Sequence, residues 1–188
     1  MARPRSEDKR EAILDAATRV IASQGLSAAT ATIAKAAGVA NGSLFVYFET
    51  KADLLNALYV ELKEEMAKAS LEGLRKDEEP QAQMRHVWSR WVAWATANRE
   101  KRRTLVLLGT SDEITQRSRH AGHQSMAGIA ELMEHVKARG PMRDASLAFV
   151  SALMNATADA TIDFIMNDPP NAERHCKAGF DALWRIIA

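Results

Sequence analysis

The sequence has little of what membrane-bound or disulfide-bonded proteins require. It contains a single cysteine, Cys176, so an internal disulfide and a four-cysteine zinc site are both excluded. The longest uncharged run, residues 145–158, includes serine, asparagine and threonine and is shorter than the roughly 18 apolar residues of a membrane-spanning helix. Charged residues follow the N-terminal arginines where a signal peptide requires an apolar stretch. We therefore expect a soluble, cytoplasmic protein with no membrane partner.

An excess of one charge is also missing. The chain has 25 lysines and arginines against 24 aspartates and glutamates, which leaves a net charge of +1. Overall charge therefore indicates neither nucleic acid nor an acidic substrate, and any partner must be recognised locally. Aromatic residues make up only 6% and prolines number five. Long stretches free of proline, with apolar residues spaced at three and four, favour helices, so we predict an all-α protein.

Helix start and stop signals divide the chain. The first helix is expected over residues 7–24, between an N-cap at Ser6 and a stop at Gly25. Two short helices, residues 29–37 and 41–48, follow. Thr50 and Asp53 form a variant of the capping box that begins a fourth helix, which extends to about Leu74. Further helices are expected at residues 81–98, 101–110, 112–139, 144–166 and 171–187.

Residues 33–48 have the properties of a helix-turn-helix. Ala34 and Ala37 are small enough for two helices to cross closely, and Gly38 can adopt the positive φ that the turn requires. Three apolar side chains are expected to point inward: Val39, Leu44 and Phe48.

The other face of the second helix carries no charge. It consists of hydrogen-bonding, glycine and apolar residues: Asn41, Gly42, Ser43, Phe45, Val46 and Tyr47. Such a face can lie close to the major groove of double-stranded DNA, where amides and hydroxyls read base edges and apolar atoms contact thymine methyl groups. The pattern therefore indicates double-stranded DNA as a partner.

The stretch from about Arg10 to Leu62 resembles the DNA-binding domain of the tetracycline-repressor (TetR) family. The family pattern is roughly I-A-x-x-A-G-V-S-x-G-x-L-Y-x-Y-F-x-x-K-x-x-L-L. This sequence matches it at Ile33, Ala34, Ala37, Gly38, Val39, Gly42, Leu44, Tyr47, Phe48, Lys51, Leu54 and Leu55. The resemblance implies a transcriptional regulator, a ligand-responsive repressor by analogy, that acts as a homodimer without catalysis, cofactor or metal.

Three positions depart from the family pattern. Ala40 replaces a serine and removes an N-cap, so the second helix would begin at Asn41. Phe45 replaces a tyrosine and cannot donate a hydrogen bond. The spacing from Gly25 to Gly38 is one residue shorter than in most relatives, which leaves open whether Thr30 or Thr32 contacts phosphate.

The resemblance implies a role for each position of this surface. Tyr47 and Lys51 would bind phosphate, Lys51 together with the amides at the start of the fourth helix. Asn41, Ser43 and Val46 would read bases. Basic residues near the N-terminus would either form an arm along the DNA or be disordered: Arg3, Arg5, Lys9 and Arg10.

The resemblance also implies two domains. Residues 1–50 would form the DNA-binding domain, residues 51–74 a connecting helix, and residues 75–188 a regulatory and dimerisation domain. The charged stretch 75–80 is the expected joint, although it could equally be a solvated helix end and turn.

The helix expected over residues 144–166 has apolar residues on two sides. Such a helix is covered both by its own domain and by a partner, so we expect a two-fold four-helix bundle with the last helix. The expected interface residues are Phe149, Leu153, Ala156, Phe164, Phe180 and Trp184. A two-fold dimer would require a palindromic operator.

Three tryptophans, Trp88, Trp91 and Trp94, recur at a helical spacing. They would either wall a pocket for a small apolar or amphipathic ligand or fill a core. Other candidate lining residues are Met126, Met133 and Asp159.

Two alternatives are a helical protein-binding adaptor and a helical-bundle enzyme. The enzyme is disfavoured because Ser125 follows Gly122 by three residues, whereas a nucleophile elbow requires two. His120 and His123 lack the glutamate spacing of a di-iron site. An adaptor would leave the uncharged face of residues 41–47 unexplained.

Overall fold

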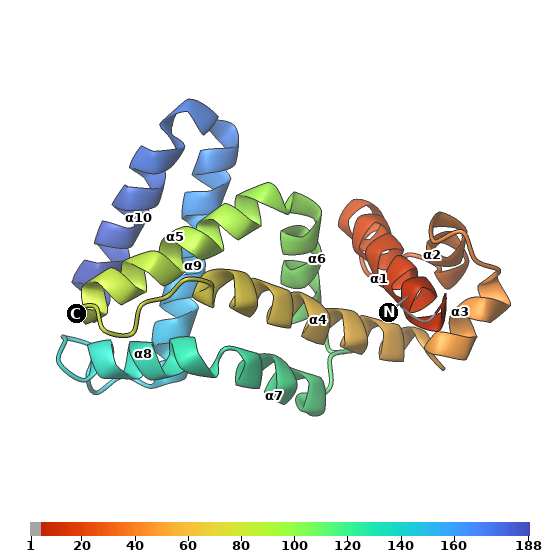
Figure 1. Ribbon diagram of the computed structural model, residues 1–188, viewed down its shortest axis with the longest axis horizontal. Coiled ribbons are helices and arrows are strands. Elements are labelled where there is room, and N and C mark those ends of the chain that lie inside the picture. Colours follow the sequence, from red (N-terminus) through yellow and green to blue (C-terminus); the bar gives the residue numbers. More distant parts are fainter. Residues whose placement is uncertain (1–4) are drawn as a thin grey trace. The chain divides into compact units, whose positions relative to one another are not determined.

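The computed structural model describes residues 5–188, with side chains from residue 7 onward, and these residues form helices and no strands (Figure 1). The prediction of an all-α protein is confirmed. The helices are α1 (Arg5–Gln24), α2 (Thr30–Ala36), α3 (Asn41–Tyr47), α4 (Lys51–Leu71), α5 (Pro80–Ala97), α6 (Arg99–Gly109), α7 (Gln116–Ser125), α8 (Ala127–Lys137), α9 (Leu147–Asn167), the 3-10 turn η1 (Pro169–Asn171) and α10 (Ala172–Ile187).

The first four helices lie close to their predicted ranges, but two of the predicted ends are wrong. Helix α1 begins at Arg5, so Ser6 lies inside the helix instead of capping it, and α4 ends at Leu71, before Gly73, which has a positive φ of +77°. Gly25 and Gly38, which follow α1 and α2, have φ values of +79° and +69°, a region that residues with a Cβ rarely adopt. At the start of α4 the Thr50 backbone N–H donates to Asp53 Oδ2 at 3.0 Å, and the Asp53 N–H donates to Thr50 Oγ1 at 3.1 Å. The predicted variant of the capping box is therefore confirmed.

The prediction of one helix over residues 112–139 is wrong. The segment forms two helices, α7 and α8, with a break at Met126, whose φ and ψ are −93° and 3°. Gly122 and Gly128 lie on either side of the break and lower the helix propensity of the region. Helix α7 also begins later than expected, after Thr115, whose hydroxyl accepts from the Ser118 N–H at 3.2 Å.

The helices form two compact units, each built from separate segments of the chain. The first contains the described residues up to Glu64 together with Asn98–Gln124, and the second contains Glu65–Ala97 and Ser125–Ala188. The boundary predicted at residues 75–80 separates a DNA-binding domain from a regulatory domain, and this functional division stays a prediction. That stretch is a surface loop within the second unit, where Arg75 pairs with Asp77 and Glu78.

In the first unit α1 packs against both α2 and α6. Its core includes the fully buried Ile13, Ile21 and Ile33. Thr104 of α6 is also fully buried and donates its hydroxyl to the Thr18 carbonyl of α1 at 2.9 Å. Helix α6 therefore supports α1, although Thr104 lies 86 residues after Thr18 in the sequence.

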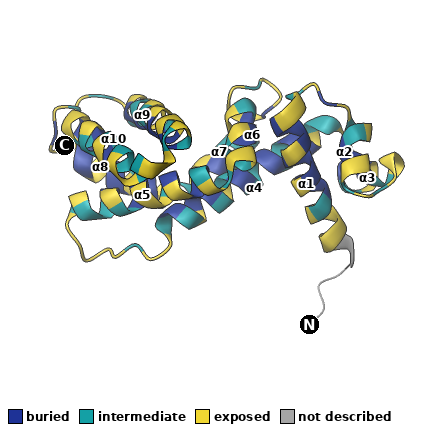
Figure 2. Ribbon diagram, turned by 90° about the horizontal axis from the view of Figure 1, so that it is seen from above, coloured by how far each residue is buried: buried dark blue, intermediate teal, exposed yellow. Residues whose placement is uncertain are grey.

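In the second unit α9 and α10 lie side by side as an antiparallel pair joined by η1, and α5 packs against α8, α9 and α10 (Figure 1). Trp88 of α5 and Phe180 of α10 are buried at the centre of this packing. Figure 2 shows that the buried residues follow one side of most helices, as amphipathic helices require. None of the helices within residues 5–188 has the length and hydrophobicity to cross a bilayer.

Candidate nucleic-acid interface

A tight turn joins α2 to α3. The Gly38 N–H donates to the Lys35 carbonyl at 3.2 Å, and the Val39 N–H donates to the Ala34 carbonyl at 3.0 Å. These two bonds satisfy carbonyls at the end of α2, and they depend on the positive φ of Gly38. The turn therefore fixes where α3 begins relative to α2.

Helix α3 buries one side and exposes the other. Leu44 and Phe48 are buried in the core of the first unit, and Val39 is half-buried. The side chains of Val46 and Phe45 are 80% and 40% exposed, which is unusual for large apolar residues. Asn41 and Gly42 are exposed, whereas Ser43 and Tyr47 are half-buried.

Helix α3 begins at Asn41, as the loss of the family serine predicted. Ala40 occupies the N-cap position with an extended backbone, and no side chain caps the helix. The Ala40 carbonyl accepts the first hydrogen bonds of the helix, from the Ser43 N–H at 2.9 Å and from the Leu44 N–H at 3.3 Å. The residues of α3 include no acidic or basic side chain.

Tyr47 ends α3 and Lys51 begins α4, with only three residues between them. Both side chains are half-buried, and within the described part of the chain neither makes a hydrogen bond or an ion pair. Helix α4 extends for 21 residues, so the positive end of its dipole lies beside Lys51. The two residues thus offer a phenol and an ammonium group next to the exposed face of α3.

The two candidate threonines lie in the first turn of α2. Thr30 is its first residue, the N-cap is Ala29, and neither Thr30 nor Thr32 is used as a side-chain cap. Both threonines are half-buried.

Arg10 is held against the first unit. Its guanidinium lies 3.5 Å from Glu61 Oε2 and 5.5 Å from the centre of the Phe48 ring. Burial raises the pKa of Glu61, and the nearby Arg10 partly offsets that shift. Arg10 was expected in an arm along the DNA or in a disordered segment, but it contacts Glu61 and Phe48 of the first unit. Lys9 is exposed, whereas Arg3 and the side chain of Arg5 lie outside the described residues.

The sequence left open whether the three tryptophans line a pocket or fill a core, and two of them, Trp88 and Trp94, are buried. Trp88 donates its indole N–H to the Cys176 carbonyl, and Trp94 donates its own to Glu65 Oε1, each at 3.0 Å. Trp91 is half-buried and meets Trp88 edge to face with ring centres 6.3 Å apart. Met133 is buried, and Met126 and Asp159 are half-buried.

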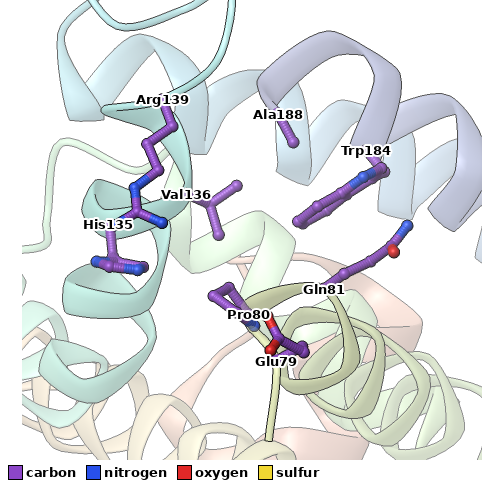
Figure 3. A pocket seen from close by; sticks show the side chains of 8 residues that line it. All are labelled: Glu79, Pro80, Gln81, His135, Val136, Arg139, Trp184 and Ala188. Carbon is purple, nitrogen blue, oxygen red and sulfur yellow. The ribbon is translucent and has the colours of Figure 1, made fainter.

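A pocket of about 360 Å³ in the second unit is lined by other residues (Figure 3). Only one of these lining residues, Trp184, belongs to a site that the sequence predicts, because no helical pattern connects the three segments that meet there. The lining residues are Glu79, Pro80, Gln81, His135, Val136, Arg139, Trp184 and Ala188.

The residues expected at a dimer interface fall into two groups. Phe149 and Phe164 of α9 are 53% and 65% exposed, Ala156 is exposed, and Leu153 is half-buried. Phe180 differs from the expectation, because only 1% of it is exposed and its ring stacks on Trp184 with centres 6.0 Å apart. Phe180 thus belongs to the core of its own unit, and Trp184 is half-buried beside it.

Among the residues considered for enzyme chemistry, Gly122 has a packing role. A Cβ at Gly122 would lie 3.0 Å from the Tyr59 ring and 3.1 Å from Lys63 Cγ, so Gly122 permits a close contact between α7 and α4. Partial burial lowers the pKa of His123, and the charges of Lys63 and His120 act in the same direction. Across residues 5–188 no three histidine, cysteine or acidic side chains are grouped to hold a metal ion.

Comparisons with known proteins agree with this geometry. Residues 13–58 match the family model of bacterial regulatory proteins, tetR family. The HTH-type transcriptional regulator AcrR of Shigella flexneri is 27% identical over 140 residues, which cover 69% of this chain and 65% of that protein. The matched region thus spans about two thirds of the length of that relative.

Two solved structures have the same fold over nearly their whole length. A tetR family transcription regulator from Shewanella sp. PV-4 matches with a TM-score of 0.84 and 28% identity, covering 94% of this chain and 96% of that one. The transcriptional regulator FadR from Bacillus subtilis, solved in complex with stearoyl-CoA, matches with a TM-score of 0.71 and 20% identity, covering 95% and 99%. All three named proteins are transcriptional regulators, and none is named as an enzyme.

Proposed function

This chain is a TetR-family protein with the DNA-binding domain of that family at residues 13–58, and from that premise we propose that it is a homodimeric transcriptional repressor that binds a palindromic operator. Its proposed place of action is the cytoplasm, where bacterial DNA is accessible. A small apolar or amphipathic ligand is proposed to control the affinity for DNA.

The observation that carries the proposal is the exposed, uncharged face of α3. Val46 and Phe45 would cost free energy if they remained in water, and they have no covering element within the first unit. Because α3 carries no charged side chain, it can approach base edges without the free-energy cost of removing water from a charge. The major groove accepts an α-helix of this size, which makes it the partner that fits the face best.

Affinity would come from groups at the edge of α3. Lys51 and Tyr47 are placed to bind phosphate oxygens, with the amides at the start of α4 contributing to the same site. A threonine of α2, Thr30 or Thr32, would contact the backbone on the other side. These contacts hold the protein in register and are independent of base sequence.

Two copies of the chain would present two α3 helices. The exposed row of Phe149, Ala156 and Phe164 on α9 is the proposed contact between copies, since a two-fold interface pairs one surface with itself. A dimer that binds two half-sites requires a palindrome with centres about one helical turn or more apart.

Control by a ligand is supported by the relative that was solved with stearoyl-CoA. The dimer would exist in two states, and in only one of them would the spacing of the two α3 helices match the operator. A ligand that binds the other state more tightly lowers the affinity for the operator, by an amount set by the difference between its affinities for the two states. Residues Trp91, Met126 and Asp159, which are half-buried in the second unit, remain the proposed ligand contacts.

The experiment that tests the function is selection of bound fragments from a random DNA pool by the purified chain. A palindromic consensus is the expected result, and binding should weaken steeply with salt because phosphate contacts release counterions. Binding without any consensus, or no binding at all, would contradict the proposal and favour a protein-binding adaptor.

Three variants then separate the roles of the residues. Lys51→Ala and Tyr47→Ala should weaken binding by similar factors for all sequences, whereas Asn41→Ala should change the preferred bases. Lys76→Ala, which removes an exposed lysine from the loop after α4, is the matched control and should bind normally. Unchanged operator binding by all three interface variants would remove α3 and α4 from the interface.

A further inference from the structure

The pocket of about 360 Å³ in the second unit is lined neither by residues of the proposed DNA surface nor by Trp88, Trp91 or Trp94. It is formed by the start of α5, the end of α8 and the end of α10. Figure 3 shows Arg139 and Trp184 entering from opposite sides, with Val136 between them and Pro80 below. Its volume is at the lower end of the range of about 300–1,000 Å³ that is typical of small-molecule sites.

The walls of this pocket carry hydrogen-bond donors that the described chain does not use. Neither the Arg139 guanidinium nor the Trp184 indole N–H has a hydrogen-bond or ion-pair partner within residues 7–188. The same holds for the imidazole of His135 in the last turn of α8. By contrast, the indole N–H groups of Trp88 and Trp94 are both bonded within the second unit.

The main apolar surface of the pocket is the ring of Trp184. One side of the Trp184 ring is stacked on Phe180, and the half-buried remainder lines the pocket together with Val136 and Pro80. Glu79 is the one acidic side chain among the eight lining residues. The start of α5 at Pro80 brings the positive end of a helix dipole beside that acid, whereas the ends of α8 and α10 bring negative ends. The attraction for an anion therefore depends on the guanidinium of Arg139.

We propose that this pocket binds a small organic anion with an aromatic or other apolar body. The carboxylate of the ligand would accept hydrogen bonds from Arg139, whose planar guanidinium can hold two carboxylate oxygens at once. The body of the ligand would lie against Trp184. The site lies wholly in the second unit, so its test is independent of DNA binding.

Calorimetric titration of the full chain with 2-naphthoate tests this site. We expect saturable binding, and we expect the uncharged analogue 2-naphthamide to bind at least tenfold more weakly. Arg139→Gln should weaken naphthoate binding about tenfold or more while changing naphthamide binding little, because only the anion uses the charge of Arg139.

Arg143→Gln is the matched control, because Arg143 is an exposed arginine of the same unit that does not line the pocket. It should bind naphthoate as the wild type does. No saturable binding of naphthoate, equal binding of acid and amide, or equal binding by wild type and Arg139→Gln would each overturn the proposal.

A second inference concerns the bases that α3 reads, and it rests on the proposed function. The commonest contact to guanine is a bidentate one from arginine or lysine, and cytosine is read by acidic side chains. Helix α3 has none of these residues. The side chains that it exposes are the amide of Asn41 and the apolar groups of Phe45 and Val46.

These exposed groups match the edge of an A·T pair. The amide of asparagine can bond adenine at both N6 and N7, and the thymine methyl is the one apolar group in the major groove. We infer that A·T pairs lie under α3 in each half-site, with adenine read by Asn41 and thymine methyl groups covered by Phe45 or Val46.

Replacing consensus thymines by uracil, one at a time, tests this inference on the selected operator. Uracil lacks only the methyl group, so at a contacted position the wild type should bind about fourfold more weakly, as expected for one uncovered methyl. Phe45→Ala or Val46→Ala should bind the thymine and uracil forms of that position equally.

A consensus with G·C pairs throughout the half-site, or equal affinity for every uracil and thymine form, would overturn this inference while leaving sequence-specific DNA binding intact. A selection without any consensus would overturn the proposed function and this inference with it.

Discussion

Thr50 and Asp53 show how two side chains can define a helix start. Each satisfies the backbone N–H of the other, and the Thr50 hydroxyl also donates to Asp53 Oδ2 at 2.7 Å. Lys51, the proposed phosphate ligand, lies between them, so the pair fixes the backbone on which that lysine is presented.

We expect Thr50→Ala to lower the free energy of unfolding by about 0.5–2 kcal/mol, the usual cost of losing an N-cap. Denaturant titration followed by circular dichroism would measure it. Thr50→Ser keeps the acceptor oxygen and should be close to the wild type. Equal stability of the alanine and serine variants would show that the cap contributes nothing.

A second residue-scale contact joins α9 to α10. The ring of His175 lies with Nε2 at 2.8 Å from Asp168 Oδ2, and Asn171 donates to the same carboxylate at 3.0 Å. The hydrogen bonds from His175 and Asn171 lower the pKa of Asp168 below its usual value of 3.8. A carboxyl with a lowered pKa in the folded state stabilises the fold above its unfolded pKa and loses that effect as the pH falls through the folded pKa.

The wild type should therefore be more stable than Asp168→Asn at about pH 5, and the difference should shrink as the pH is lowered toward 2. Thermal melts of both proteins across this range would measure the difference. A difference that stays constant, or grows, on acidification would show that the carboxylate does not stabilise the turn at η1.

At the scale of elements, the helices follow directly from the sequence, whereas their mutual contacts do not. Caps, glycines and apolar spacing predicted most helix boundaries near the N-terminus, because those signals act within a few residues. The start of α1 is an exception, since the helix continues past the expected cap at Ser6 to Arg5. Phe180 lies on an amphipathic helix, but its pattern could not distinguish a partner chain from Trp88 of the same unit. The break at Met126 escaped prediction because no proline marks it.

Close helix crossing explains one glycine of α10. A Cβ at Gly179 would overlap the Thr161 hydroxyl of α9 and would lie 2.9 Å from the Trp88 ring of α5. We expect Gly179→Ala to lower the free energy of unfolding by about 1–3 kcal/mol, the usual effect of overpacking a core.

Gly128→Ala is the control for this crossing, because a Cβ there meets its first neighbour at 3.8 Å. Because alanine has a higher helix propensity than glycine, Gly128→Ala should raise the free energy of unfolding by up to about 1 kcal/mol. Both variants can be compared by denaturant titration. A neutral Gly179→Ala would mean that α9 and α10 can separate without cost.

At the scale of the whole molecule, the exposed phenylalanines of α9 predict a dimer. A row of exposed aromatic and alanine residues is rare on a monomer and typical of a surface that another chain covers. The candidate DNA face could be predicted from sequence because one motif places it, whereas the pocket near Trp184 joins three segments that no motif connects.

Phe149→Glu and Phe164→Glu should each raise the dimer dissociation constant at least tenfold, since a carboxylate would be buried against its own copy. Sedimentation velocity over a concentration series would measure it. Val106→Glu changes an exposed valine of the first unit and should leave the association unchanged. Dimers of normal stability in both phenylalanine variants would place the interface elsewhere.

The interleaved order of the two units limits how this protein can be engineered or can evolve by recombination. The chain passes between the units at Glu64, at Ala97 and at Gln124, so no single crossover point exchanges one unit intact. A chimaera joined at residue 50 or 64 would pair a foreign α1 with the native α6, and its carbonyl at the position of Thr18 would have to suit the buried Thr104 hydroxyl. We expect functional hybrids only when residues 98–124 are transplanted together with the N-terminal helices.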